Sequence, residues 1–133
     1  MGIYINGIGA ISPVRFFGNN SLLGEVEGNS ATRINCLEPD YTGLIDQKSV
    51  RGMSRIIRMG VASAFLALKD AAVSKPDAII TGTAFGCLED TATFLTKMIV
   101  NKEQALNPTP FMQSTHNTMG SQIALLLDCT GYN

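Results

Sequence analysis

The sequence predicts an α/β layered domain. Two runs rich in β-branched residues, at positions 3–11 and 78–83, are typical of strands, and three other stretches have the residue pattern of helices. Strands that alternate with helices along one chain favour a sheet covered by helices. Only two strands are visible, fewer than the roughly four to six of a typical sheet. The remaining strands therefore either lie unnoticed between residues 15 and 51 or are supplied from elsewhere.

The first predicted strand covers residues 3–11 and ends before Pro13, because proline has no backbone N–H to donate to a neighbouring strand. From residue 15 to residue 51 no helical or alternating period persists, and glycine, asparagine and proline recur at short intervals. We expect an irregular segment there, with at most a short helix near residues 22–26.

A long helix is the next predicted element. Ser54 can cap a helix start, and residues 55–73 are strong helix formers with no internal proline. Their apolar side chains occupy more than one stripe of the helix, so most of its circumference should be covered by other parts of the protein. Water should reach it mainly at Arg55, Arg58, Lys69 and Asp70.

The second half of the chain predicts one strand and two helices. Residues 78–83 form a short apolar run consistent with an interior strand. A helix should follow from Glu89 and Asp90 to about Val100, because acidic side chains are favourable at a helix N-terminus. Residues 107–110 are predicted to be a loop, and residues 115–127 to be a largely buried third helix that ends at 128–131.

Composition and charge exclude several classes of function. A net charge of −1 gives no field that would attract nucleic acid or an anionic membrane. No stretch reaches the roughly 18 apolar residues of a membrane span, and the first residues do not have the pattern of a secretory signal. Cys36, Cys87 and Cys129 are far apart and lie in no metal-binding motif. We expect reduced thiols in a soluble, cytoplasmic single domain over residues 1–133.

Two glycine-rich segments invite comparison with nucleotide-binding loops. In the first, Ser12 stands where a dinucleotide fingerprint has its third glycine, and a proline stands where the helix should begin. The second, at residues 82–86, lacks the Gly-Lys-Ser/Thr ending of a P-loop, so no lysine is placed to neutralise a phosphate. Nucleotide binding is disfavoured at both, and close backbone approach is the better interpretation of the second.

Three other features could carry chemistry. His116, the only histidine, is near a predicted helix start, where a capping or packing role is more common than that of a general base. Glu89 and Asp90 are adjacent and point apart on a helix, so complementing the helix dipole is the better account of them. Cys87 could be a reactive thiol at a helix N-terminus, where the dipole lowers a thiol pKa, although no histidine is near it in sequence.

Several segments together resemble the β-ketoacyl-acyl-carrier-protein synthase family in their order and spacing. Residues 5–13 look like the family's opening strand and turn, commonly T-G-x-G-x-x-S-P-x-G. Residues 51–62 are similar to the start of its first long helix, commonly R-R-M-x-R and then alanines. Residues 82–87 fall at its G-T/S-G-x-G-G segment, and residues 108–117 fall at its proline-rich loop, which leads to an asparagine.

The resemblance spans nearly the whole chain and is weakest between residues 18 and 50. The spacing from Asn117 to Gly131 also fits the interval from the family's asparagine to its Gly-Pro motif. Other positions depart from the pattern and point to a divergent branch, such as one near the chain-length-factor partners of synthase heterodimers. The replaced family residues are three glycines and one proline, and they are replaced by Arg15, Ala84, Cys87 and Tyr132.

The resemblance implies a thiolase-like layered fold, of which this chain would be the N-terminal portion, an incomplete half. It also implies that the family's nucleophilic cysteine lies just beyond Asn133, so that Cys129 does not occupy the position of the nucleophile. The later family histidines, or histidine and asparagine, would lie outside the chain as well. We therefore expect no catalytic residue, no cofactor-binding residue, no cofactor and no metal site, and no condensing activity from this chain alone.

Two functional hypotheses follow. The first is an N-terminal segment of a β-ketoacyl synthase-like protein, whose intact form acts on acyl groups held by acyl carrier protein in fatty acid or polyketide synthesis. The second is a non-catalytic scaffold or chain-length-factor-like interaction domain that acts by self-association. We expect a homo-oligomer, because the exposed edge of the strand at 78–83 would recruit another chain. Neither nucleic acid nor a membrane is an expected partner.

Overall fold

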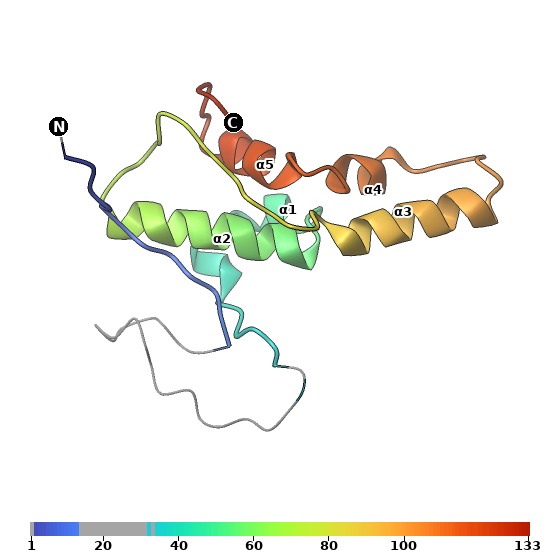
Figure 1. Ribbon diagram of the computed structural model, residues 1–133, viewed down its shortest axis with the longest axis horizontal. Helices are drawn as coiled ribbons and strands as arrows, with labels where there is room; N and C mark the ends of the chain where they lie inside the picture. Colours follow the sequence, from blue (N-terminus) through green and yellow to red (C-terminus); the bar gives the residue numbers. More distant parts are fainter. Residues whose placement is uncertain (1, 14–31, 33) are drawn as a thin grey trace.

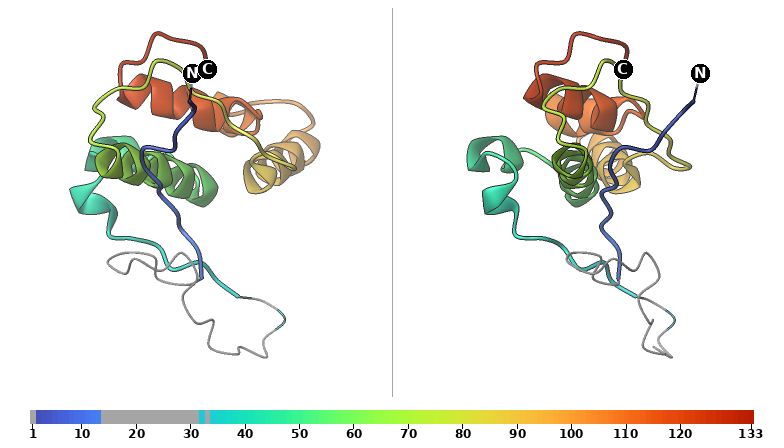
Figure 2. Two further views of the ribbon diagram at one scale, coloured as in Figure 1. Left: turned by 60° about the vertical axis from the view of Figure 1, so that its left-hand side comes forward. Right: turned by 90° about the vertical axis from the view of Figure 1, so that its left-hand side faces the viewer.

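The computed structural model describes residues 2–13, 32 and 34–133, and helices dominate it (Figures 1 and 2). In chain order, the elements are the 3₁₀-helix η1 (Tyr41–Gly43) and the α-helices α1 (Gln47–Val50), α2 (Arg55–Asp70), α3 (Leu88–Val100), α4 (Pro108–Gln113) and α5 (Thr118–Leu126). The short helix predicted near residues 22–26 lies outside the described residues.

The predicted α/β, thiolase-like layered fold is wrong. Within the described ranges no sheet forms, and the one strand-like pairing is an isolated parallel bridge between Ala78 and Tyr132. Residues 3–11 are not a strand, and in the predicted interior strand Ile80 is 88% exposed. β-branched residues favour a strand where a neighbouring strand and a covering layer are present. Neither of these segments has a paired strand beside it.

Helix α2 confirms the predicted long helix, with two differences. Ser54 occupies the capping position, but its hydroxyl makes no capping hydrogen bond. The helix ends at Asp70 rather than at residue 73, and Ala72 just beyond it has a left-handed φ of 54°. The expected covering of most of the circumference is confirmed, because in this helix only Arg55, Ile56, Lys69 and Asp70 are exposed. Arg58, which was also expected to meet water, is instead half-buried.

The other two predicted helices form, with small shifts in their limits. Helix α3 starts at Leu88 and has Glu89 and Asp90 in its first turn, as predicted. Helix α5 is shorter than predicted and only partly buried, because Leu125 is exposed. Asp128, with a left-handed φ of 49°, lies two residues beyond its last turn.

Three short helical elements were not predicted, although each has a local signal. The side chains of Asp40, Asp46 and Asn107 accept hydrogen bonds from backbone N–H groups at the starts of η1, α1 and α4. Residues 107–110 are therefore not a loop, because Pro108 begins α4. Proline is favoured at the first position of a helix, where its missing N–H would have no partner in any case.

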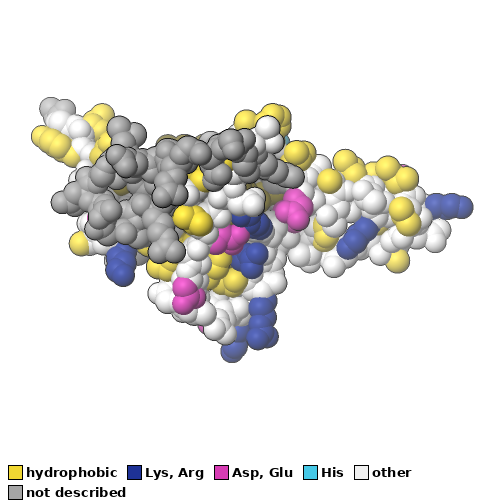
Figure 3. All heavy atoms as spheres, turned by 90° about the horizontal axis from the view of Figure 1, so that it is seen from below, with side chains coloured by type: hydrophobic (Ala, Val, Ile, Leu, Met, Phe, Trp, Pro, Cys, Tyr) yellow, Lys and Arg dark blue, Asp and Glu magenta, His cyan; other side chains and the backbone are white. Residues whose placement is uncertain are grey.

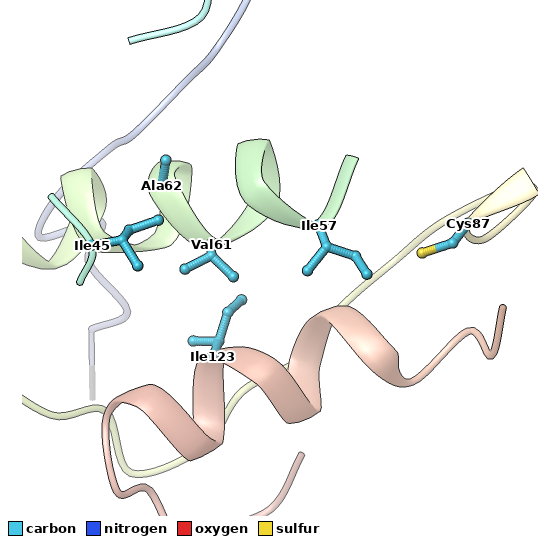
Figure 4. Close-up of a cluster of buried hydrophobic side chains, with 6 residues drawn as sticks. All are labelled: Ile45, Ile57, Val61, Ala62, Cys87 and Ile123. Atoms are coloured by element: carbon cyan, nitrogen blue, oxygen red, sulfur yellow. The ribbon is translucent and has the colours of Figure 1, made fainter. Parts of the chain in front are cut away.

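The core lies between α2 and α5 (Figure 4). Ile57 and Val61 of α2 are fully buried and face Ile123 of α5. Ile45, from the turn after η1, and Cys87, just before α3, complete this cluster. The core thus joins segments from four parts of the chain, while α3 and α4 pack against each other away from it (Figure 1).

The N-terminal segment crosses α2 and touches its backbone. A Cβ atom on Gly7 would collide with the Ala67 carbonyl, and one on Gly9 would collide with the Ser63 carbonyl. The backbone N–H of Ile8 donates a hydrogen bond of 2.9 Å to Asp70 Oδ2. Glycine at these two positions therefore permits the close approach, which places the extended segment on the helix.

The C-terminal residues lie against residues 76–79. The N–H of Ile79 donates to the carbonyl of Tyr132 at 2.7 Å, and the Cys129 thiol donates to the carbonyl of Pro76 at 3.2 Å. Gly131 lies so close to the Asp77 carbonyl that a side chain there would collide with it. We call this pairing of residues 76–79 with 129–132 the C-terminal clip.

Many apolar side chains remain exposed, including several on the projecting arm formed by α3 and α4 (Figure 3). None of the described helices combines the length and the hydropathy needed to cross a membrane. Cys36, Cys87 and Cys129 are free thiols, as predicted.

Candidate functional site

In the described part of the chain, a groove of about 520 Å³ opens beside α4, and this volume is within the usual range for small-molecule sites. It lies between α4, the first half of α5 and the turn that precedes α2. None of its lining residues is charged or titratable. They are Ser49, Gly52, Met53, Thr109, Phe111, Met112, Gln113, Thr115, Thr118, Ser121 and Gln122.

Helix α4 is fixed at both ends. At its start, Asn107 Oδ1 accepts a hydrogen bond of 2.9 Å from the N–H of Thr109. Within it, the ring of Phe111 contacts that of Phe94 on α3, with the ring centres 5.3 Å apart. At its end, Gln113 Nε2 donates to the carbonyl of Gly52 across the groove. These contacts give the groove its walls.

Two of the hydroxyl groups of the groove, those of Thr115 and Thr118, are already engaged as hydrogen-bond donors. Thr115 Oγ1 and Thr118 Oγ1 both donate to the carbonyl of Met112, and they lie 2.8 Å apart. Because these protons satisfy a carbonyl and no base lines the groove, the hydroxyl groups are not activated as nucleophiles. The lining of the groove, which has no charged side chain, suits an uncharged ligand.

The second glycine-rich segment meets the turn before α5. Gly86 adopts a left-handed φ of 61°, and its N–H donates to Thr83 Oγ1 at 3.0 Å. The His116 ring lies about 3.5 Å from the position of a Cβ atom on Gly86. A Cβ atom on Gly86 would therefore be in ordinary van der Waals contact, and the Cβ position of Gly82 faces open space, so the expected close backbone approach is not seen at either glycine. The positive φ is what favours glycine at position 86.

His116 packs against this loop, in agreement with the predicted packing role. Its ring makes no hydrogen bond with any residue of the described part of the chain, so no partner activates it as a base. The next residue, Asn117, donates from Nδ2 to Ser121 Oγ at 3.0 Å, which secures the first turn of α5. The segments 82–87 and 108–117, each of which resembles a part of one family, thus lie next to each other.

Cys87 is not an activated thiol. It occupies the capping position of α3, but it is buried, and burial raises its pKa, with a smaller contribution from the negative charge of Asp90. Desolvation opposes the thiolate form that a reactive cysteine needs, so the burial of Cys87 disfavours the hypothesis of a reactive thiol. Cys129 is also buried, and its thiol is engaged in the C-terminal clip.

Glu89 and Asp90 point apart, as predicted: Glu89 is exposed and Asp90 is 8% exposed. The burial of Asp90, whose Oδ2 atom has no hydrogen-bond partner, was not predicted. Its neighbours do not make a metal site, since the described residues contain no cluster of three or more His, Cys, Asp or Glu side chains that could hold an ion.

A charged network at the start of α2 was also missed. Arg55 Nε forms an ion pair with Glu38 Oε1, and the Tyr41 hydroxyl donates to Glu38 Oε2 at 2.7 Å. The guanidinium of Arg58 lies 5.7 Å from the centre of the Tyr41 ring. No short sequence spacing indicates this network, because it joins residues 38–41 to a helix that begins fourteen positions after Tyr41.

No protein-family model matches the chain, and no curated protein matches its sequence.

Proposed function

We propose that this chain is the N-terminal part of a β-ketoacyl synthase-like protein and that it contributes an acyl-binding surface to it. The proposal is supported by the order and spacing of the segments that resemble the family. It rests on those residues and on the groove, not on a sheet, because the described residues form none. In the whole protein, the acyl groups would arrive on acyl carrier protein.

The groove is the observation that carries the proposal. Residues 108–117, which resemble the family's proline-rich loop, provide Thr109, Phe111, Met112, Gln113 and Thr115 to its lining. A groove that has apolar side chains and no charge suits an acyl chain, because no ionic group loses its water when the chain binds. The Ser121 hydroxyl, which accepts a hydrogen bond from Asn117 and keeps its own proton to donate, suits the carbonyl end of such a chain.

Binding without condensation is the expected role of this chain. A condensation needs an activated thiolate to hold the acyl group and donors to stabilise the enolate oxygen. Cys87 and Cys129 are buried, and no base lines the groove. Turnover of acyl and malonyl carrier-protein substrates that disappears in Cys129→Ala would contradict this role.

Titration with a fluorescent long-chain fatty acid tests the groove. In Met112→Arg, a charge enters the groove at a side chain that is already exposed, so the fold should tolerate it. Affinity should fall at least about tenfold, which corresponds to roughly 1.4 kcal/mol, because an unpaired charge beside buried methylenes costs more than that. In the control Leu95→Arg, on α3 outside the groove, binding should be unchanged.

Two results would count against the acyl-binding proposal. If the unaltered chain does not bind the probe, the groove has no acyl-binding role. If Met112→Arg and Leu95→Arg weaken binding equally, the probe adheres to exposed apolar surface in general rather than to the groove.

A second candidate function is that of a non-catalytic interaction domain acting by self-association. It is favoured by the exposed apolar side chains at the N-terminus, on α3 and on α5, since surfaces of this kind recruit partners. Light scattering at micromolar concentration tests this candidate. A compact species of 14.2 kDa that binds no hydrophobic dye would refute it.

A further inference from the structure

We infer that the extended segment formed by residues 3–6 is a docking strand for a second copy of this chain. The two copies of the segment would pair antiparallel about a two-fold axis at Tyr4. This inference rests on the self-association candidate and names the surface through which that association would occur.

The segment is held at its C-terminal end. Beyond it, Gly7 and Gly9 lie against the backbone of α2, and the N–H of Ile8 bonds to Asp70. Residues 3–6 continue past this anchor and project away from the helices (Figure 2). An anchored base limits the conformations of the segment, so less entropy is lost when it pairs.

The segment presents an open strand edge. Within the described residues, the backbone groups of residues 3–6 make no hydrogen bond with another segment. Ile3, Tyr4 and Ile5 are 100%, 81% and 83% exposed. Extended backbone offers donors and acceptors at the spacing that another extended strand matches, and its β-branched and aromatic side chains suit a strand.

Self-complementarity identifies a second copy as the partner. Residues 2–12 contain no charged side chain, so two copies do not repel each other. With the axis at Tyr4, the two tyrosines face each other on one side of the pair, and Ile3 faces Ile5 of the second copy on the other side. A two-fold interface brings the same surface patch of both copies together, and each of these contacts pairs two apolar side chains.

Helix α3 does not offer an equivalent edge. Its Ile99 is 74% exposed, but the backbone groups of a helix interior are bonded within the helix. An apolar helix face can adhere to another surface, yet it has no directional donors and acceptors to fix a register. Ile99 therefore provides a matched control for the strand.

Disulfide trapping tests the register. In an antiparallel pair, directly opposed Cβ atoms are about 4.5–5.5 Å apart, close enough for a disulfide after a small adjustment. Tyr4→Cys should give a cross-linked dimer of about twice 14.2 kDa under mild oxidation. Ile99→Cys and the unaltered chain, which share the three native cysteines, should remain largely uncross-linked. Equal cross-linking in all three would overturn the register.

Charge placement tests the interface. Tyr4→Lys puts two ammonium groups opposite each other, so dimer affinity measured by light scattering should fall at least about tenfold, while Ile99→Lys should dimerise normally. A dimer that survives Tyr4→Lys refutes the docking strand but leaves self-association standing. A chain that stays monomeric at every concentration refutes both. The fatty-acid titration is independent of either result.

Discussion

Tyr41 holds the network that joins residues 38–41 to the start of α2. Its hydroxyl donates to Glu38, its ring lies beside Arg58, and Glu38 in turn pairs with Arg55. The hydrogen bond from Arg55 and then that from Tyr41 hold the pKa of Glu38 below its usual value. Burial, followed by the hydrogen bond to Glu38, raises the pKa of Tyr41 to about 12.

The raised pKa of Tyr41 has a consequence for stability at high pH. Because the folded pKa exceeds the ordinary value of 10.0, the contribution of the neutral phenol is fully present below pH 10 and is lost as the pH rises toward about 12. We expect a spectrophotometric titration of the native protein to show a phenolate step near pH 12 that is absent in Tyr41→Phe. If Tyr41→Phe instead removes a phenolate step near pH 10, Tyr41 is not held by this network.

Where the N-terminal segment contacts α2, at Gly7 and Gly9, there is no room for a side chain. A methyl group at Gly9 would meet the Ser63 carbonyl and the N–H of Ala67, both of which are helix backbone and cannot move aside cheaply. At Gly82 the same methyl group would meet nothing within 4 Å. The two glycines therefore make a matched pair.

We expect Gly9→Ala to lower the free energy of unfolding by about 1–3 kcal/mol, the usual cost of overpacking, or to release the segment from α2. Gly82→Ala should change it by no more than about 0.5 kcal/mol. Urea unfolding measures the change in the free energy of unfolding of both variants. Faster amide exchange of residues 7–9 in Gly9→Ala would report release of the segment from α2. Equal effects of the two substitutions would show that the segment does not pack on α2.

Elements set by local sequence were predictable, whereas those that depend on distant partners were not. Helices α2, α3 and α5 follow from helix-forming composition, apolar spacing and acidic first-turn residues that lie within each segment. Helix α4 could have been predicted too, since Asn107 followed by Pro108 is a helix-start pattern. A strand at residues 78–83 needs hydrogen bonds from another segment, and composition alone does not reveal whether one is available.

The same distinction applies to the candidate site. The sequence correctly indicated that Glu89 and Asp90 point apart, but not the conformation of Gly86, which is set by its positive φ rather than by a close approach. The groove was not predictable, because it forms only when Met53, Met112 and Ser121, from three separate segments, come together. The burial that keeps Cys87 unreactive likewise depends on packing rather than on its position before α3.

The stability of the whole molecule depends on a small core. Ile57 and Val61 are fully buried, while many apolar side chains elsewhere are exposed. Because the core has few buried side chains, each should contribute strongly to the free energy of unfolding. A cavity at the contact of α2 with α5 would have few neighbouring side chains that could fill it.

We expect Ile57→Ala to reduce the free energy of unfolding by about 2–5 kcal/mol through lost burial and a residual cavity. Ile56→Ala, the same change at the adjacent and 40% exposed position, should cost less than about 1 kcal/mol. Thermal and urea unfolding of the two variants give the comparison. Similar losses from both would place the core on another face of α2.

The C-terminal clip closes a long loop of the polypeptide. Residues 76–79 and 129–132 lie together, so the chain between them, which contains α3, α4 and α5, starts and finishes at one point. Segments closed in this way tend to open and reclose as one cooperative unit. Loss of the few bonds at the junction would therefore loosen this stretch, while Ile123 of α5 would still pack against Ile57 and Val61 of α2. A protease that cuts after such an opening would sever a stretch that carries Ile123, one of the buried residues of the core.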